Sequence, residues 1–468
     1  MGTTTLLTLK DTLLRDPLLS KLSTLAKRED AALFLVGGYL RDLLIGVHRR
    51  DYDLALSREA SFLIPQIEEI VGFHFFKVGK KDTITYRIIQ RDMSIDLTYL
   101  QGETIKEDLG RRDFTMNAIA FCLRDETFHS PEGALEDIER QVIRSVSHRA
   151  IDQDPLRMLR AIRYLSTLEG FRLDALLMNE ITLKKHQIDK MPGERLKMEM
   201  DHILLAPHRD QGLRALHESG LLLVLFPELR ELENLRQGEY HHLNTLSHTL
   251  LAIEKMSWAI DWCSSNHHEI PLTPEMYLSV SYAALFHDLG KQDTHQVDEK
   301  GKVHFYHHES FSCRAAEGIM DRLRFSWAMR DQVLRLIQYH MRILNLSRET
   351  KDPALKRLVN QAGDETPLLV LLTLADKEAS RGILSVPRDD MVEGHCLRIL
   401  EFYGEKDIVH PLPWVTGSDV MRLGYAPGPK VGQILRFIQE KQVTGEVKTR
   451  DDALRLLKEE FGQLKDEP

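Results

Sequence analysis

The sequence predicts an α+β protein in which the strands come first and the helices follow. Between residues 31 and about 147, short apolar or alternating segments typical of strands are separated by short helical segments. From residue 154 onward the strand pattern largely disappears, and helical segments run to the end of the chain. We therefore expect a mixed sheet with helices in the N-terminal part, followed by a long helical region.

Length and composition limit the number of domains and the kinds of partner. At 468 residues the chain exceeds one ordinary core, so two to four domains are expected. The formal net charge of −9 argues against general electrostatic adhesion to RNA or membranes, so any nucleic-acid site must be a local basic patch. Composition shifts predict boundaries near 147, 235 and 408, which give the regions 1–147, 148–235, 236–408 and 409–468.

Cysteine usage and hydropathy bear on the cellular setting. The four cysteines are far apart and match neither a disulfide framework nor a zinc ribbon, so a reducing cytoplasm is expected. Lys10 and Asp11 interrupt the apolar run near the N-terminus, and no later window of about eighteen residues is uncharged and apolar. We expect neither secretion nor membrane insertion.

The first elements can be justified in order. Residues 1–30 have leucines at spacings of three and four, which predicts a helical lead-in. The segment 31–36, AALFLV, predicts a buried strand, and Gly37-Gly38 predicts a turn whose backbone N–H groups can approach phosphates. A short helix, YLRDLLIG, follows and places Arg41 near its start. The other predicted strands are DYDLAL, FHFFKV, TITYRIIQ, SIDLTYL and MNAIAFCL.

Asp51 and Asp53 are the most informative residues of this region. In a strand, positions i and i+2 face the same side, so both carboxylates can bind one divalent metal while Tyr52 points away. A lone pair of alternating acids is usually a solvated strand face. Here a strand, a glycine turn, Arg41 and a helix precede the pair, and this combination predicts metal-dependent phosphoryl transfer with both aspartates as catalytic ligands.

Four motifs in sequence carry a family resemblance. GGYLRDLL followed by RRDYDLAL resembles the head of the class II tRNA nucleotidyltransferase and bacterial poly(A) polymerase family, within the polymerase-beta superfamily. RRDFTMNAIAF (111–121), PEGALEDIERQVIRSV (131–146) and QDPLRMLRAIRY (153–164) resemble its next three motifs. The resemblance implies a nucleotidyltransferase head with a mixed sheet, an all-α neck, and Mg²⁺-dependent, template-independent addition of CMP and AMP from CTP and ATP to the 3′ end of tRNA. A poly(A) polymerase of the same fold is the alternative.

The resemblance also assigns roles to individual residues. Asp96 in SIDLTYL corresponds to the third carboxylate, although a solvating acid at a strand edge is the alternative. Asp154 and Arg157 correspond to a pair that reads the base edge, and Asp154-Pro155 predicts a helix start with Arg157 one turn inside. Gln153 stands where the family usually has Glu. The expected nucleotide-binding residues are Gly37, Gly38, Arg41, Arg112, Asp113, Asn117, Asp154, Arg157, Arg160 and Arg163.

In RRDFTMNAIAF the polar positions Asp113, Thr115 and Asn117 alternate, so we expect them on one face of a strand. By resemblance this motif recognises the ribose and phosphates of the incoming nucleotide. Arg160 and Arg163 are expected to meet the triphosphate or the RNA backbone.

A second set of ligand-capable residues begins after Tyr240. Its members are His248, His287, Asp288, His308, His340 and Asp376, and His287-Asp288 follows an apolar helical segment. The set resembles an HD domain, a metal-dependent phosphohydrolase module, and its ligands suit a divalent transition metal or Mg²⁺. Satisfied core histidines are the alternative. If this module were the active part, the head would be a nucleotide sensor, but a sensor has no need for both Asp51 and Asp53.

Two features bear on how much the chain adds to its acceptor. The C-terminal segment 416–457 resembles the helical tail of bacterial tRNA nucleotidyltransferases with an HD module, which implies RNA contact. Family members that make the full CCA triplet usually carry a longer flexible segment between the third acidic strand and the RRD motif than the one between Asp96 and Arg111. Full CCA synthesis is the first expectation, and partial synthesis, CC alone or A alone, is the alternative that this segment and Gln153 raise.

Overall fold

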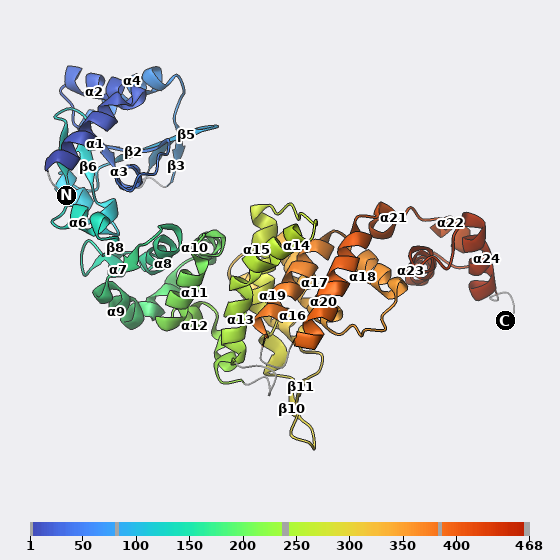
Figure 1. Cartoon of the computed structure of the whole chain (residues 1–468). Helices are drawn as coiled ribbons and strands as arrows, with labels where there is room; N and C mark the ends of the chain where they lie inside the picture. Colours follow the sequence, from blue (N-terminus) through green and yellow to red (C-terminus); the bar gives the residue numbers. More distant parts are fainter. Residues whose placement is uncertain (1–2, 80–83, 236–242, 382–385, 463–468) are drawn as a thin grey trace. The chain divides into compact units, whose positions relative to one another are not determined.

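The computed structural model describes residues 3–79, 84–235, 243–381 and 386–462. The chain divides into two compact units, Met1–Leu225 and Phe226–Pro468 (Figure 1). Thr83, at the start of one predicted strand, and residues 240–242, at the start of the second ligand set, lie outside the described residues. No helix within the described ranges is long and apolar enough to cross a membrane.

A seven-stranded sheet in the order β3-β4-β5-β2-β1-β6-β7 forms the N-terminal part of the first unit. Strands β2 and β5 run parallel, which places Asp53 opposite Asp96, and the other neighbours are antiparallel. The strands are β1 (Leu33–Val36), β2 (Asp51–Leu56), β3 (Phe76–Val78), β4 (Thr85–Gln90), β5 (Met93–Tyr99), β6 (Ala120–Cys122) and β7 (Thr127–His129). The mixed sheet predicted for this region is confirmed.

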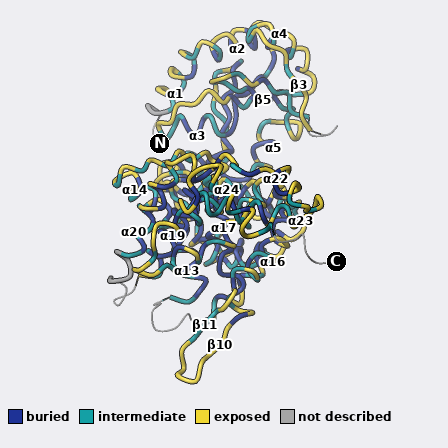
Figure 2. The backbone as a smooth tube through the Cα atoms, turned by 90° about the vertical axis from the view of Figure 1, so that its right-hand side faces the viewer, coloured by how far each residue is buried: buried dark blue, intermediate teal, exposed yellow. Residues whose placement is uncertain are grey.

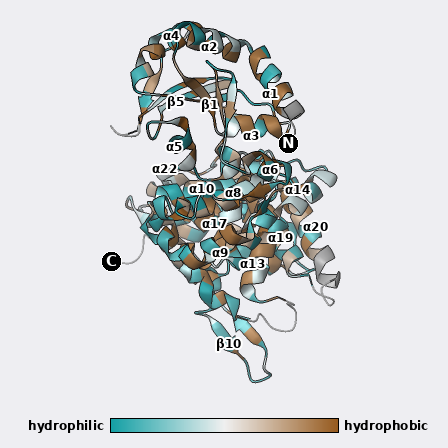
Figure 3. Cartoon of the chain, turned by 90° about the vertical axis from the view of Figure 1, so that its left-hand side faces the viewer, coloured by the Kyte–Doolittle hydropathy of each residue, from teal (hydrophilic) through white to brown (hydrophobic). Residues whose placement is uncertain are grey.

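One face of the sheet is tied to a layer of helices, α1 (Thr3–Arg15), α2 (Pro17–Arg28) and α4 (Leu63–Val71). Asp16 caps α2 by accepting hydrogen bonds from the backbone of Leu18 and Leu19. Its other oxygen accepts a hydrogen bond of 2.7 Å from the Tyr52 hydroxyl, so Tyr52 of β2 points to this layer. Hydrophobic and hydrophilic residues alternate along α2 and α4, as expected for helices with one buried face (Figure 3).

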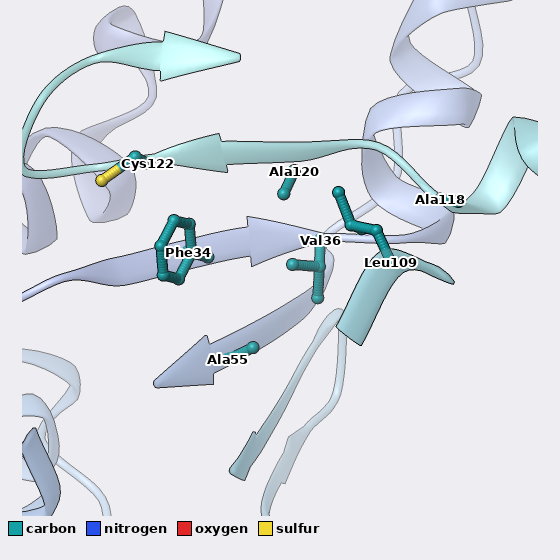
Figure 4. Packing of buried hydrophobic residues seen from close by; sticks show 7 residues of the cluster. All are labelled: Phe34, Val36, Ala55, Leu109, Ala118, Ala120 and Cys122. Carbon is teal, nitrogen blue, oxygen red and sulfur yellow. The ribbon is translucent and has the colours of Figure 1, made fainter. Parts of the chain in front are cut away.

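The opposite face of β2 carries the two aspartates and is covered at one end only. Phe34, Val36, Ala55 and Ala120 form an apolar cluster there, which Leu109 of helix α5 (Ile105–Gly110) closes (Figure 4). Because Ala55 lies two residues after Asp53, both side chains share this face. Helix α5 therefore seals the face beside Ala55 and leaves Asp53 accessible.

Helices make up most of the rest of the first unit, and α8 packs against α10 and α11. A short parallel pair, β8 (Val142–Ile143) with β9 (Arg172–Leu173), joins α8 to the chain before it. The remaining elements are α3 (Gly38–Leu44), η1 (Glu59–Phe62), η2 (Thr115–Asn117), α6 (Ala134–Glu139), α7 (Ala150–Gln153), α8 (Arg157–Thr167), α9 (Ala175–Lys184), η3 (Lys185–Lys190), α10 (Gly193–Leu205), α11 (Arg209–Glu218) and α12 (Leu222–Leu225).

The second unit is built around helix α19 (Thr366–Ala379), which is buried along almost its whole length (Figure 2). Around it lie α13 (Thr245–Glu254), α14 (Met256–Ser265), α15 (Pro274–Phe286), α17 (Trp327–Leu344) and α20 (Val386–Tyr403). The other elements are η4 (Pro227–Glu233), η5 (Leu289–Lys291), α16 (His308–Arg322), α18 (Asp352–Ala362), η6 (Gly363–Glu365) and α21 (Lys406–Val409). Helices α22 (Gly417–Met421), α23 (Pro429–Val443) and α24 (Arg450–Phe461) share a smaller core at the C-terminal end.

Three details differ from the sequence predictions. The helical region also contains strands, namely β8 and β9 and the exposed hairpin of β10 (His295–Val297) and β11 (Val303–Phe305). Thr115–Asn117 is a 3₁₀ turn and not a strand, so the prediction that Asp113, Thr115 and Asn117 share one face of a strand is wrong. Asn117 donates a hydrogen bond to Asp113, whereas Thr115 donates one to Asp137. Helix α8 begins at Arg157, because Asp154 ends α7 and the intervening residues form a turn.

Candidate functional site

A pocket of about 390 Å³ opens in the first unit at the exposed end of β2. Its walls come from the turn after β1, from the end of β5, from residues 111–117 and from the start of α8. Five arginines and four aspartates line it: Arg41, Arg111, Arg112, Arg157, Arg160, Asp53, Asp108, Asp113 and Asp154. Several guanidinium groups around one cavity suit the oxygens of a triphosphate.

The three candidate carboxylates lie on neighbouring strands but have different surroundings. Asp53 lines the pocket, whereas Asp51 is exposed and accepts a hydrogen bond of 2.8 Å from Ser94. Asp96 is held by Arg87 through two hydrogen bonds, 2.6 Å from Nε and 2.5 Å from Nη2. Among the described residues these three carboxylates do not form a three-ligand cluster like those of the second unit.

The surroundings of Asp53 make its ionised form costly. Burial raises its pKa to about 6, and the neighbouring Asp96 adds to this effect. Arg112, Arg41 and the backbone N–H of Gly38 act in the opposite direction and lower the pKa. A partly buried carboxylate with a second acid beside it favours a bound cation, which suits the divalent metal of phosphoryl-transfer chemistry.

The glycine turn brings the backbone close to Asp53 and Arg112. Gly37 has a positive φ of 77°, and a Cβ there would lie 3.0 Å from Nη1 of Arg112 and 3.3 Å from Asp53 Oδ2. A side chain at this position would therefore be strained and crowded. The N–H groups of the turn, however, bond within the protein: Gly37 donates to the carbonyl of Ile119, and Gly38 donates to Asp53.

Arg41 lines the pocket and contacts several of its neighbours. Its guanidinium donates two hydrogen bonds to Asp42 and one of 2.6 Å to Asn117, and it lies 5.0 Å from the centre of the Tyr164 ring. Asn117 in turn donates to Asp113, whose other oxygen lies 2.5 Å from Nη2 of Arg160. Burial opposes the charge on Asp113, but Arg160 and Asn117 outweigh it and lower the pKa of that carboxyl.

The predicted base-reading pair lies at the junction of α7 and α8. Asp154 accepts a hydrogen bond from the backbone of Leu156 and pairs with Arg195 at 3.3 Å. Arg157 donates to the carbonyls of Arg111 and Ala150, at 2.5 and 3.2 Å, and to Gln153 at 3.4 Å. Burial lowers the pKa of Arg157. Both side chains reach the pocket wall, so the pair lies where a base can meet it.

Not every predicted nucleotide-binding residue joins the pocket. Gly37, Gly38, Arg41, Arg112, Asp113, Asn117, Asp154, Arg157 and Arg160 line it, but Arg163 does not. Arg163 pairs with the buried Glu199 at 3.3 Å and lies over the Tyr164 ring. Its position favours a packing role.

Six residues of the pocket lining received no role in the sequence analysis: Thr98, Tyr99, Gln101, Asp108, Arg111 and Tyr164. Arg112 is held by Asp108 at 3.1 and 3.2 Å, whereas the exposed Arg111 has no ion-pair partner among the described residues. Arg111 is therefore the arginine of this motif with its guanidinium available to an anion. The spacing of Asp108 and Arg112, four residues apart in a helical segment, was a usable signal. Tyr164 gave no local signal, because Arg41, which lies over its ring, is distant in sequence.

The second predicted set of ligands meets in the interior of the second unit. His248 of α13, His287 after α15 and Asp376 of α19 form one grouping, and Asp288, His308 of α16 and His340 of α17 form another. All six side chains are buried. His248 Nε2 lies 2.9 Å from Asp376, and the Nε2 atoms of His308 and His340 are 3.1 Å apart. Asp288 touches both groupings, with Oδ2 3.2 Å from His287 and Oδ1 3.5 Å from His308.

The hydrogen bonds of three histidines fix their inward-facing nitrogens. Nδ1 of His287, His308 and His340 bonds the carbonyls of Ala284, Phe305 and Ile337, at 2.8, 2.9 and 2.6 Å. A carbonyl only accepts, so each Nδ1 carries a proton and each Nε2 of the neutral ring presents a lone pair. Two such lone pairs face each other between His308 and His340. This arrangement suits a cation between the ligands better than a closed hydrogen-bond network.

The charge balance of the cluster agrees with cation binding. Burial lowers the pKa of His308, and burial together with His287 and His308 lowers that of His340 to about 3, so both rings stay neutral near pH 7. Burial opposes the charge on Asp288, yet His287 and Lys291 lower its pKa well below the usual range. Neutral imidazoles and ionised carboxylates are the ligand forms that metals require, and His308, His340 and Asp288 are in these forms. His287 differs, because Asp288 and Asp376 outweigh burial and raise its pKa.

Comparison with known families and relatives agrees with this geometry. Residues 33–144 match the family model "Poly A polymerase head domain", residues 170–232 match "Probable RNA and SrmB-binding site of polymerase A", and residues 305–457 match a model of tRNA nucleotidyltransferase domain 2. A CC-adding tRNA nucleotidyltransferase of Thermus thermophilus is 34% identical and covers 91% of this chain and 92% of its own. An A-adding tRNA nucleotidyltransferase of Deinococcus radiodurans is 31% identical and covers 90% and 93%.

The fold has a solved counterpart. The Thermotoga maritima CCA-adding enzyme, solved in complex with tRNA, covers 97% of this chain and 98% of its own with a TM-score of 0.61 and 20% identity. At this identity the likeness concerns the fold. The relatives at 34% and 31% identity span almost the whole chain on both sides and carry the assignment. This chain is a nucleotidyltransferase and belongs to the tRNA nucleotidyltransferase family.

Proposed function

We propose that this chain adds cytidylate from CTP to the 3′ end of tRNA and stops after CC. Addition of nucleotides to tRNA is the activity of its CC-adding and A-adding relatives, and these relatives favour it over the alternative of a poly(A) polymerase. The limit to partial synthesis rests mainly on one observation, the segment between Asp96 and Arg111. The choice of CC over A rests on the higher identity to the CC-adding relative, 34% against 31%.

That segment is short and packed. After β5 ends at Tyr99, five residues lead into α5, which ends at Gly110 immediately before the RRD motif. Asp108 of α5 accepts a hydrogen bond from the backbone of Gln101, and Glu107 of α5 accepts one from the backbone of Glu103. These two bonds hold the connection between β5 and α5 against the helix. Leu109 packs on Val36 and Ala55. A pocket wall held in this way supports recognition of one base and opposes the rearrangement that a change from C to A requires.

Gln153 supports the same limit. The family usually has Glu at this position, and a carboxylate there would form an ion pair with Arg157. The amide of Gln153 instead accepts a neutral hydrogen bond at 3.4 Å, which is weaker than a charge-assisted one. Arg157 is then positioned chiefly by the carbonyls of Arg111 and Ala150.

In the proposed reaction the acceptor 3′-hydroxyl attacks the α-phosphate of CTP and pyrophosphate leaves. Asp51 and Asp53 would hold Mg²⁺, which supplies charge neutralisation at the phosphates. Arg111 and Arg112 meet the triphosphate, and Asp113 and Asn117 meet the ribose. Asp154 accepts from the amino group of cytosine, and Arg157 donates to its ring acceptors. These roles rest on the pocket geometry and on the resemblance of the motifs.

The test supplies the full-length protein with CTP and ATP together. One acceptor is tRNA that ends at the discriminator base, and the other is tRNA that ends in CC. Extension of the first acceptor by two residues, with no extension of the second, is expected. Conversion of both acceptors to complete CCA would refute partial synthesis, and extension of the second acceptor alone would make the chain an A-adding enzyme.

The buried histidine and aspartate cluster favours a second activity. We propose that its histidines and aspartates would hold a divalent metal, which would supply charge neutralisation and an activated water, and that the cluster hydrolyses a phosphoester such as a 2′,3′-cyclic phosphate. Water would attack phosphorus, and one P–O bond to the ribose would break. His287→Ala is expected to remove hydrolysis and leave nucleotide addition intact. Absence of metal in the native protein, with no cleavage on adding Ni²⁺, Mn²⁺ or Mg²⁺, would make the cluster structural.

A further inference from the structure

One face of the seven-stranded sheet continues beyond the catalytic acids to an exposed edge. Asp53 lies opposite Asp96, Asp96 opposite Arg87, and Arg87 opposite Phe76. Directly opposite residues on neighbouring strands point to the same face, so these four side chains form a row across β2, β5, β4 and β3. Within the described residues the pocket lining includes Asp53 but not the other three.

The outer end of this row is apolar and exposed. Phe76 is 49% exposed, and Ile89 and Val78, which alternation places on the same face, are 60% and 39% exposed. A solvated edge strand normally carries charged or polar side chains here. An exposed aromatic ring with aliphatic neighbours beside an arginine is instead the combination that binds unpaired bases and their phosphates.

Arg87 can reach a phosphate without leaving Asp96. Its two hydrogen bonds to Asp96 use Nε and Nη2. Nη1 has no hydrogen-bond partner among the described residues, and the side chain is 39% exposed. The remaining donors of the guanidinium are therefore accessible from the side of Phe76 and suit a phosphate oxygen.

The chemistry sets the direction from which the acceptor arrives. In phosphoryl transfer the attacking and leaving oxygens lie roughly in line on opposite sides of the phosphorus. The nucleotide pocket, with Arg111 and Arg112, occupies one side of Asp53. The row through Asp96, Arg87 and Phe76 leads from Asp53 across β5 and β4 to the edge strand β3, outside the lining of that pocket.

We infer that the edge surface formed by Phe76, Arg87 and Ile89 binds the 3′-terminal nucleotide of the acceptor RNA. The Phe76 ring stacks on the terminal base, and Nη1 of Arg87 pairs with the adjoining phosphate. This inference rests on the proposed function and adds an acceptor subsite to it. Phe76 and Ile89 are positioning residues, because they hold the acceptor and touch no reacting atom.

The test compares Phe76→Ala and Phe76→Tyr with Phe62→Ala in the full-length protein. Phe62 is also 49% exposed but lies in η1, outside the row, and so is a matched control. Phe76→Ala is expected to raise the KM for tRNA ending at the discriminator base about tenfold, which corresponds to about 1.4 kcal/mol of lost stacking. The KM for CTP and the rate at saturating tRNA should stay near wild type, and Phe76→Tyr should restore the wild-type KM.

A binding measurement separates stacking from catalysis. The acceptor carries 2-aminopurine at its 3′-terminal position, and stacking on wild-type protein and on Phe62→Ala should quench its fluorescence without CTP. Phe76→Ala should lose most of this quenching, and Arg87→Met should reduce the salt dependence of binding by about one phosphate contact. An unchanged KM and unchanged quenching in Phe76→Ala, in a protein that still adds cytidylate, would overturn the subsite. Failure of the wild type to extend tRNA would instead refute the proposed function.

Discussion

Arg160→Met is expected to destabilise the first unit by about 2–3 kcal/mol at pH 7. Asp113 is 7% exposed, and Nη2 of Arg160 lies 2.5 Å from its Oδ2. Removing one partner of a buried ion pair costs about 3–5 kcal/mol, because the other charge stays buried. The cost should be smaller here, since Asn117 and the backbone of Phe114 still donate to Asp113. The Arg160 side chain is also 35% exposed, so solvent screens part of the attraction.

The destabilisation should depend on pH in a defined direction. The pKa of Asp113 in the folded protein is lowered from its ordinary value of 3.8. Its stabilising contribution is therefore present above about pH 4 and declines as the pH falls through the folded pKa. Without Arg160, burial acts against a weaker opposing charge and the folded pKa rises. The difference between wild type and variant should therefore be full near neutral pH and shrink below pH 4.

Urea unfolding followed by far-ultraviolet circular dichroism measures the change. All four tryptophans, Trp258, Trp262, Trp327 and Trp414, lie in the second unit, so their fluorescence follows that unit separately. Arg172→Met, at an exposed position of β9, should change the free energy of unfolding by less than about 0.5 kcal/mol. Asp113→Asn combined with Arg160→Met should cost less than the sum of the single variants. A loss below about 0.5 kcal/mol for Arg160→Met, or one of equal size at pH 3.5 and pH 7, would refute the reasoning.

Three further outcomes are expected. Asp51→Ala and Asp53→Ala should each abolish nucleotide addition with an unchanged unfolding midpoint, and substantial transfer in Mg²⁺ by either variant would remove the metal assignment. Because the pKa of Asp53 is about 6, affinity for the divalent metal, followed by titration calorimetry, should fall as the pH drops below 6, and a flat profile from pH 5 to 8 would contradict this. Asp154→Ala and Arg157→Ala should reduce discrimination among the four nucleoside triphosphates by about 1–3 kcal/mol, whereas unchanged kcat/KM ratios would leave the pair with only a structural role at the α7–α8 junction.

Local periodicity and motif order were enough to predict strand β2 and most members of both candidate sites. Alternation in DYDLAL predicted β2, and the structure places Tyr52 against the helical layer while Asp53 lines the pocket. The order of the six histidines and aspartates predicted a ligand set whose members do meet in the second unit. Such signals are readable because a strand repeats every two residues and each motif is a local run of chain.

Tertiary structure decided which of these side chains are available. Arg111 and Arg112 are neighbours of the same type in the RRD motif, and the sequence does not distinguish them. In the structure Asp108 of α5 binds Arg112, and Arg111 has no ion-pair partner in the described region. The Thr115 hydroxyl donates a hydrogen bond to Asp137, 22 residues later in the chain, so Thr115 does not share a face with Asp113 as predicted. Arg163 forms an ion pair with Glu199 and does not line the pocket. Asp154 accepts a hydrogen bond from Arg195, 41 residues later in the chain.

The row of side chains that leads to the proposed acceptor subsite also depends on tertiary structure. Asp53, Asp96, Arg87 and Phe76 become neighbours only because β2 pairs in parallel with β5 and because β4 and β3 then extend the sheet. A sequence lists these residues on four separate strands and does not state their register. Register depends on how the whole sheet buries its apolar face, which is a property of the packed fold and not of any one segment.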